Sequence, residues 1–306
     1  MRDSIVEGGF GGFGGALHIA GGQASIFASF FIDNSAYLAG GAIMAEPVRL
    51  VVEDSGFFHN GGWGDMAYGG GAIFCYGCDL TLRRVVFSDN QGSTSTSGYG
   101  GGAVVVMPYH GSTYATLVAS DVVATRNDAD SGGAIAAHGD ATTMALHNVS
   151  LMDNTARFGG GLYSIDSHVS LTNSVLSGNV AQSGGGAWLP LYAGHNPTIH
   201  QCVFDNNVAG VLDGGMCSLC LVVGATFLPG HSHSDWLAGG GVNFGSPSDA
   251  DSGSETLVVT NSMFSSNRAP QHGGGAINGN IYVEFEGCSF YNNSVLTAEG
   301  GGKSWW

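Results

Sequence analysis

The stretch FIDNSAYLAGGAI, Phe31–Ile43, contains the features that decide the fold: an aromatic residue, an Asn three positions later and then Gly-Gly-Ala-Ile. The same order returns near the other end of the chain as FSSNRAPQHGGGAI, Phe264–Ile277. With Asn34 as position zero, the phrase recurs at Asn60, Asn90, Asn127, Asn154, Asn179, Asn207, Asn267 and Asn293, and in a degenerate copy at Gly230. Ten copies in one register identify an internal repeat.

Each copy also has a regular pattern of apolar residues around the Asn. Positions −10, −8, −5 and −3 are apolar or small, and position −6 is often Asp or Asn. This alternation is typical of short strands, and the Asp or Asn marks a corner between them. Position −3 is occupied by Phe31, Phe57, Phe87, Ala124, Leu151, Leu176, Phe204, Phe227, Phe264 and Phe290.

A single copy cannot bury its apolar face, whereas copies stacked in parallel share one continuous core. The pattern therefore predicts an all-β chain, a right-handed parallel β-helix (β-solenoid) of about ten coils with three short strands per coil. Ten layers of strands give a rod roughly 48 Å long. We expect one domain over residues 1–306, which is either a piece of a longer chain or an uncapped protomer that stacks end to end.

The repeated residues are expected to build the rod rather than to carry chemistry. The Phe residues should stack inside it, and the Gly pairs should supply positive φ where side chains would collide between coils. The Asn should lie at a corner, tolerate a left-handed backbone and bond to the Asn of the next coil. The clearest members of these ladders are Phe31, Asn34, Phe57, Asn60, Phe87, Asn90, Phe204, Asn207, Phe264, Asn267, Phe290 and Asn293.

The composition agrees with a folded, turn-rich protein and excludes some partners. Gly accounts for 53 of 306 residues, yet 43% of the chain is hydrophobic, which is more than a disordered chain contains. The net charge is −16 with eight Lys and Arg, so binding to nucleic acid is not expected. No apolar run reaches the roughly 18 residues of a spanning helix, so direct membrane insertion is not expected either.

The Phe-x-x-Asn and Gly-Gly-Ala-Ile phrases resemble the repeat of polymorphic outer-membrane proteins, which are autotransporter adhesins of bacterial surfaces. Full Gly-Gly-Ala-Ile copies begin at Gly40, Gly70, Gly132 and Gly274, and the resemblance covers nearly the whole chain. It implies a β-helix that is extracellular or at the cell surface.

Candidate ligand contacts lie in the segments that the copies do not share, because a solenoid binds through its loops and outer faces. Exposed aromatic residues there would suit a surface glycan or a protein, although such rings also cover the base of their own loop. The candidates are Trp63, Tyr68, Tyr99, Tyr109 and His110.

No cofactor is expected, and two weak metal motifs compete with ordinary solvated loops. His231, His233 and Asp235 alternate along one segment, which would place both imidazoles on one side of a strand. The acidic segment with Asp249, Asp251 and Glu255 offers hard oxygens for Ca²⁺, but it lacks the Gly-rich calcium repeat.

Two Cys-x-x-Cys pairs, Cys75–Cys78 and Cys217–Cys220, lie too far apart along the rod to share one zinc site. A local disulfide within each pair is one alternative if the protein lies outside the cell. Cys202 and Cys288 occupy inward positions, which we expect to be three coils apart.

The chain is not expected to be an enzyme. A polysaccharide lyase or hydrolase needs paired acidic groups, or an acid cluster with a basic group, on one outer face. His138 and Asp140 lie close in sequence, but no nucleophile accompanies them. Asn148 and Asn292 begin glycosylation sequons.

The sequence therefore predicts an extracellular or cell-surface structural rod that self-associates, or meets further solenoid coils, at both ends. Uncapped coils leave ladder groups unpaired, which favours such stacking. An adhesin that binds surface glycans or proteins through its long loops is the alternative, and a polysaccharide-active enzyme is the second alternative.

Overall fold

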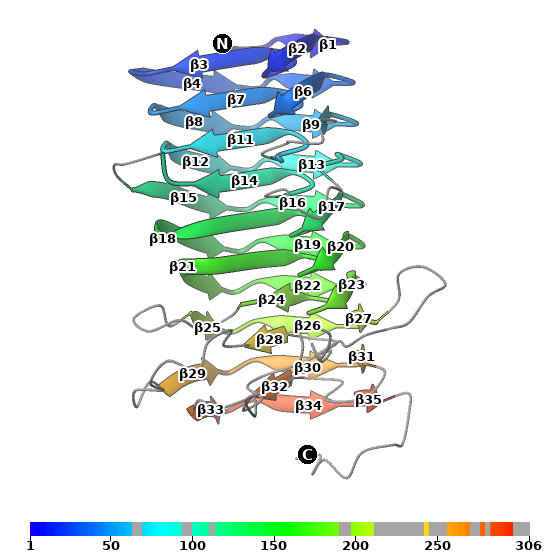
Figure 1. Cartoon of the computed structure of the whole chain (residues 1–306). Helices are drawn as coiled ribbons and strands as arrows, with labels where there is room; N and C mark the ends of the chain where they lie inside the picture. The colour runs from blue at the N-terminus through cyan, green and yellow to red at the C-terminus, as the bar shows by residue number, and fades with distance from the viewer. Residues whose placement is uncertain are drawn as a thin grey trace, which may run out of the picture.

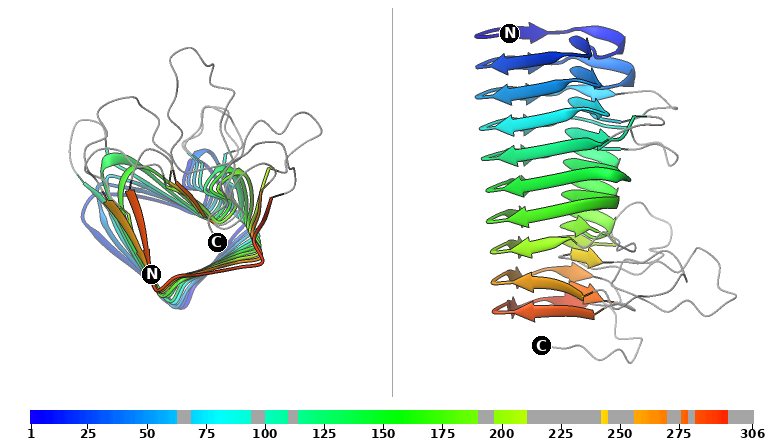
Figure 2. Two further views of the ribbon diagram at one scale, coloured as in Figure 1. Left: turned by 90° about the horizontal axis from the view of Figure 1, so that it is seen from below. Right: turned by 90° about the vertical axis from the view of Figure 1, so that its left-hand side faces the viewer.

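A computed structural model shows a right-handed parallel β-solenoid in which successive coils stack along one axis (Figure 1). The structure describes residues 1–62, 69–93, 100–109, 114–189, 197–210, 242–244, 256–269, 276–278 and 282–295. Viewed along its axis, the rod has a triangular cross-section (Figure 2). None of the described residues forms a helix, so no helical segment that could span a membrane is found among them.

Each coil passes in turn through face 1, face 2 and face 3, and a short corner strand lies between faces 1 and 2 in all of them except the coil of β13 (Val86–Ser88). Face 1 is a sheet of ten short parallel strands. Its strands are β1 (Ile5–Glu7), β5 (Phe30–Ile32), β9 (Gly56–Phe58), β13 (Val86–Ser88), β16 (Val123–Thr125), β19 (Ser150–Met152), β22 (Val175–Ser177), β26 (Val203–Asp205), β30 (Met263–Ser265) and β34 (Ser289–Tyr291).

The corner strands follow face 1 in every coil except that of β13, where Gln91 forms only isolated bridges, and they are a fourth segment that the sequence pattern did not predict. They are two to five residues long and pair with one another along the rod. They are β2 (Phe10–Phe13), β6 (Ser35–Ala39), β10 (Gly61–Gly62), β17 (Asp128–Ser131), β20 (Thr155–Phe158), β23 (Val180–Ser183), β27 (Val208–Ala209), β31 (Arg268–Ala269) and β35 (Ser294–Val295).

Faces 2 and 3 belong to one large sheet, because two long strands, β18 (Ile135–His147) and β21 (Leu162–Thr172), run through both. The other strands of face 2 are β3 (Leu17–Ala20), β7 (Ile43–Glu46), β11 (Ile73–Tyr76), β14 (Val104–Met107), β24 (Ala187–Trp188), β28 (Val242–Phe244) and β32 (Ala276–Asn278). The other strands of face 3 are β4 (Gln23–Phe27), β8 (Arg49–Glu53), β12 (Asp79–Arg83), β15 (Ala115–Ser120), β25 (Thr198–His200), β29 (Thr256–Thr260) and β33 (Tyr282–Glu286).

The fold is the one that the repeat predicts, but the coils differ from the predicted set at two places. Val6 pairs with Phe31 in face 1, so one coil precedes the first predicted copy. Phe204 pairs directly with Phe264, so no face 1 strand lies between them where the Phe227 copy was expected. As a result, Cys202 and Cys288 are two coils apart rather than three, with Ser262 between them.

Aromatic rings stack along the inside of face 1 in two blocks. The Phe31 and Phe57 centroids are 4.8 Å apart, and those of Phe57 and Phe87 are 5.0 Å apart. The second block stacks Phe204, Phe264 and Phe290 at 5.0 and 4.9 Å. Between the blocks, Ala124, Leu151 and Leu176 fill the same buried position. The rings contribute large buried apolar areas because each lies offset over its neighbour.

A continuous ladder of buried Asn side chains runs beside these rings. Asn60 shows the pattern: its backbone N–H and its Nδ2 both donate to Oδ1 of Asn90, at 3.0 and 2.9 Å. Its Nδ2 also donates to the Phe31 carbonyl at 3.0 Å, and its Oδ1 accepts two bonds from Asn34. Every polar group of the amide therefore has partners, which is what burial of an Asn requires. The ladder runs through Asn34, Asn60, Asn90, Asn127, Asn154, Asn179, Asn207, Asn267 and Asn293.

The left-handed backbone at this corner belongs to the residue before the ladder Asn, not to the Asn itself. Side chains at this preceding position project to solvent, so the repeat tolerates several residue types there. The left-handed residues are Asp33, His59, Asp89, Arg126, Asp153, Asn206, Ser266 and Asn292. A second left-handed corner lies at position −6, where Asp and Asn were expected, and includes Asp54, Asp121, Asn148, Asn173 and Asn261.

The Gly pair has two separate physical tasks. Gly40 has a φ of 66°, a conformation that L-residues rarely adopt. Gly41 lacks positive φ, but a Cβ there would overlap the carbonyl oxygen of Gly71 in the next coil. The first Gly therefore turns the chain, and the second lets adjacent coils approach.

Exposed ion pairs link neighbouring coils along both edges of face 1. Arg84 binds both carboxylate oxygens of Asp54, at 2.6 and 3.0 Å, and Arg126 binds those of Asp89 at 2.9 and 2.8 Å. The bond from Arg84 holds the pKa of Asp54 below its usual value, and the bond from Arg126 does the same for Asp89. These pairs lie in solvent, so we expect them to contribute less to stability than the buried ladder.

Replacement of Asn154 by Ala should destabilise the rod strongly. It would leave the Asn127 backbone N–H, the Asn127 Nδ2 and the Ala124 carbonyl without their partner in a buried site. Each unsatisfied buried group costs about 1–3 kcal/mol, so we expect a loss of at least about 3 kcal/mol in urea unfolding. Asn292→Gly is the matched control, because Asn292 is exposed and left-handed, which Gly tolerates. Equal unfolding midpoints for the two variants would contradict the role of the ladder.

Candidate functional site

Length variation in the coils is confined to the two sides of face 2. The corner from face 3 to face 1 has two residues in every described coil, and so has the corner from face 1 to the corner strand wherever both strands are present. By contrast, the stretch between the corner strand and face 2, and the stretch between face 2 and face 3, differ widely in length. A site that is particular to this chain is therefore expected beside face 2.

From β7 to β24, face 2 is buried on both of its sides. Ile43, Ile73 and Val104 point into the rod and belong to the main core. Their neighbours in sequence point the other way, yet they are also buried and form a second apolar cluster. This cluster contains Met44, Phe74, Val105, Met107, Ala136, Tyr163 and Trp188, together with Ala39. Double burial explains why face 2 reads as a continuous apolar run in the sequence.

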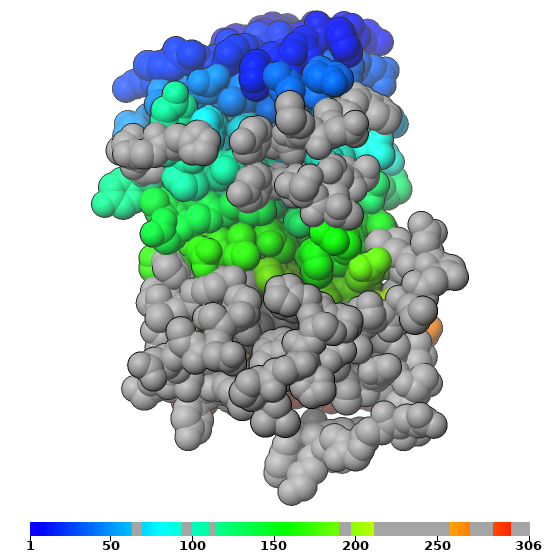
Figure 3. All heavy atoms as spheres, in the orientation of Figure 1, coloured from blue at the N-terminus to red at the C-terminus, as the bar shows by residue number. Residues whose placement is uncertain are grey.

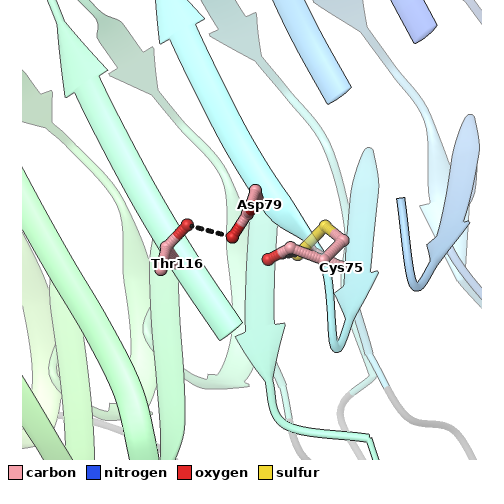
Figure 4. Close-up of a disulfide and its surroundings, with 4 residues drawn as sticks. Cys75, Asp79 and Thr116 are labelled. Atoms are coloured by element: carbon pink, nitrogen blue, oxygen red, sulfur yellow. Dashed lines mark hydrogen bonds between the residues drawn. A yellow bond between two sulfur atoms is a disulfide. The ribbon is translucent and has the colours of Figure 1, made fainter. Parts of the chain in front are cut away.

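A disulfide between Cys75 and Cys78 closes the turn between face 2 and face 3 (Figure 4). Both cysteines are buried, and the bond joins the end of β11 to the start of β12. Directly after it, Asp79 accepts a hydrogen bond from Thr116 of the next coil at 2.9 Å (Figure 4). We call Cys75–Asp79 with Tyr109, Tyr114 and Thr116 the disulfide corner.

Three tyrosines gather at the disulfide corner. The Tyr76 ring lies 4.7 Å from that of Tyr109, and Tyr109 is 38% exposed. Tyr114 is 74% exposed and precedes the strand that carries Thr116. Exposed rings next to a carboxylate and a hydroxyl offer stacking and hydrogen bonding together, which is what a sugar or a peptide surface requires.

Among the residues predicted to contact a ligand, the structure places Tyr109 at this corner. Trp63, Tyr68, Tyr99 and His110 lie outside the described residues. The two predicted metal motifs, at His231–Asp235 and Asp249–Glu255, and the pair Cys217–Cys220 also lie outside them. Within the described ranges, no three His, Cys, Asp or Glu side chains are grouped closely enough to hold a metal ion.

An acidic pair that the sequence reasoning missed lies on β17. Asp128 and Asp130 flank the buried Ala129, so both carboxylates project from the same outer side of the strand. Burial raises the pKa of both groups. Arg157 of the next coil binds the two oxygens of Asp130 at 2.9 and 3.0 Å, which supports a structural role for this carboxylate. The sequence signal for this pair was Asp128-Ala129-Asp130 within a strand, where alternate side chains point to the same side and so bring the first and third residues together.

His138 and Asp140 have different environments and do not form an obvious acid–base pair. His138 is buried beside the Tyr163 ring, with centroids 5.1 Å apart, whereas Asp140 is exposed. Burial lowers the pKa of His138 to about 3, so the imidazole is neutral at physiological pH.

The predicted glycosylation residues both occupy left-handed corners. Asn148 is exposed, and its Nδ2 donates to Asp121 at 2.6 Å. Asn292 is exposed near the last described strand. The two single cysteines are thiols, of which Cys202 is buried and Cys288 is half-buried.

Burial of His138 should make stability fall on acidification. The unfolded chain takes up a proton below pH 6.5, whereas folded His138 does so near pH 3, so stability is present above pH 6.5 and is lost below it. Between pH 6.5 and 5.5 the loss should be about 1 kcal/mol in urea unfolding. His138→Leu should flatten this dependence, while His168→Gln, at an exposed position, should not. An unchanged slope in His138→Leu would contradict the assignment.

The chain was also compared with known proteins. No protein-family model matches it, and no significant match was found among curated proteins or solved structures. Arguments about its function therefore depend on the geometry of the solenoid and on its repeat.

Proposed function

We propose that this protein is a rigid structural element of an extracellular or cell-surface assembly. The observation that supports this most is the contrast between its sides. The two corners that bound face 1 keep one length, while all length variation flanks face 2. The side of the rod at face 1 is therefore constant from coil to coil, and the side at face 2 is variable. A scaffold that holds surface groups at fixed spacing needs this arrangement.

Stiffness of the rod follows from the buried ladders. Each coil is fixed to the next by backbone bonds and by the Asn amides, which repeat from coil to coil, and two blocks of stacked rings add to these contacts. Close packing on both sides of face 2 resists bending further.

Two observations support a location outside the cell. The Cys75–Cys78 disulfide is favoured in an oxidising compartment. The repeat resembles that of polymorphic outer-membrane proteins, which are surface proteins. The strong negative charge gives solubility and disfavours nucleic acid as a partner.

Alkylation of the protein isolated from its natural source, without prior reduction, tests the location. Cys75 and Cys78 should be recovered as a disulfide by mass spectrometry. Cys202 is an internal control, because burial raises the pKa of its thiol to about 11 and it should react after unfolding. Free thiols at both Cys75 and Cys78 in the freshly isolated protein would contradict an extracellular rod.

The disulfide corner favours one second candidate, an adhesin that binds glycans or proteins. Tyr76, Tyr109 and Tyr114 present aromatic surface next to Asp79 on a turn that the disulfide holds rigid. A preorganised site loses less conformational entropy on binding, which improves its affinity.

A glycan array tests the adhesin. Tyr109→Ala and Tyr114→Ala should each weaken any binding about tenfold or more, because stacking and burial are lost. Tyr291→Ala is the matched control, since Tyr291 is 72% exposed but lies on face 1. Equal effects of all three variants would exclude the disulfide corner as the contact surface.

A further inference from the structure

Face 1 carries an exposed apolar strip on its outer side. In each of its strands the middle residue points into the core, so the first and third residues point outward. Among these outward residues, Phe30 is 43% exposed, Val86 is 38% exposed and Met263 is 40% exposed. The rings of Phe30 and Phe58 stack outside the rod with their centroids 6.3 Å apart. Parallel sheets usually have both of their faces covered, so an exposed apolar strip on such a sheet indicates a binding surface.

The strip is straight, and it lies away from the variable stretches of the chain. Face 2 is on the side of the molecule that Figure 3 shows, and face 1 is on the opposite side (Figure 2 and Figure 3). The two corners that bound face 1 keep two residues each, so no described loop rises over the strip. Ten strands of three residues give an area of about 480 Å², and the charged edges widen it toward the roughly 800 Å² that each partner buries in a stable dimer.

The two outward residues of each strand complement each other in size and polarity. We call the first residues of the face 1 strands the first column and the third residues the second column. From β9 onward, an apolar residue in one column accompanies Gly or a polar residue in the other, as with Val86 and Ser88 or with Ser150 and Met152. Two such strips fit when the first column of one lies against the second column of the other. A two-fold axis parallel to the rod produces this arrangement, because it reverses the strips across their width and keeps the coils level.

The charges along the two edges of face 1 fit the same two-fold axis. One edge carries Asp54, Arg84 and Asp121 in successive coils. In the coils of Arg84 and Asp121, the other edge carries Asp89 and Arg126 respectively. The two-fold axis would place each edge beside the opposite edge of a second copy, so Arg84 would face Asp89 and Asp121 would face Arg126. Opposite charges therefore meet in both coils, and each pair occurs twice by symmetry.

We propose that two copies of this protein pair side by side through face 1, with their rods parallel and their coils level. A second copy is the occupant because its own strip matches the coil spacing, the alternation of apolar and polar residues and the order of charges at the edges. The pairing leaves the variable stretches beside face 2 on the outer sides of the two rods. It deepens the proposed function, on which it rests, by naming the neighbour of each structural rod.

Sedimentation velocity of the whole protein over a range of concentrations tests the pairing. We expect a dimer, and Val86→Asp should raise its dissociation constant at least about tenfold, because the two-fold axis buries two such carboxylates against apolar surface. Val118→Asp is the matched control, since Val118 is 49% exposed on face 3, and it should leave the dimer unchanged. Circular dichroism should show that both variants stay folded. A monomer at every concentration, or equal weakening by the two variants, would overturn the proposal.

Cross-linking tests the register without a change in the apolar strip. Asn148 and Asp153 are exposed at the two edges of one coil. A mixture of Asn148→Cys and Asp153→Cys proteins should form a disulfide-linked dimer under mild oxidation, whereas each variant alone should form much less. The unchanged protein gives the background from Cys288, which is a half-buried thiol.

Two results of the cross-linking would overturn the parallel pair. One is the absence of cross-linking above background in the mixture, and the other is a dimer of Asn148→Cys with itself that equals or exceeds the mixed dimer. The oxidation state of Cys75 and Cys78 is independent of these outcomes. Failure of the pairing and failure of the extracellular rod are therefore distinguishable.

Discussion

The hydrogen bonds of the buried Asn ladder are the constraint on which the rest of the structure depends. An amide inside an apolar core is costly unless all its donors and acceptors are used, and each ladder Asn from Asn34 to Asn267 meets this condition through residues of the two adjacent coils. This requirement fixes the register of adjacent coils, because a shift by one residue would take the Asn away from its partners. Once the register is fixed, the rings at position −3 must stack, and the Gly pairs must come into close contact.

The same constraint separates the conserved geometry of the rod from its variable parts. Face 1 and its two short corners hold the ladder, so their lengths cannot change without loss of the register. Face 2 lies away from the ladder, and its flanking stretches are free to differ from coil to coil. The disulfide corner lies on this variable part of the coil, where surface groups can differ without affecting the winding, whereas the Asp128–Asp130 pair lies on the corner strand β17 beside it.

The winding of the chain could be predicted from the sequence because Phe-x-x-Asn and Gly-Gly-Ala-Ile recur in register. The coil with Val6 and Gly9 was missed because it has neither the Phe nor the Asn, and the copy at Phe227 was counted although Gly230 replaces its Asn. The left-handed residue was misplaced by one position because Asn tolerates that conformation well, although the bond between the Asn residues of adjacent coils was predicted. At the candidate site, Tyr109 was found as an exposed ring, but its contact with Tyr76 depends on the stacking of different coils.

The direction of the interstrand hydrogen bonds has a mechanical consequence. These bonds run roughly along the axis of the rod, because each strand lies across the rod and bonds to strands of the coils before and after it. Compression presses all the stacked coils together, whereas tension applied to the two ends loads every interface between coils and opens the weakest one first. Such a rod would resist crushing but would open coil by coil under a pull, and each opened coil would lengthen it and absorb work.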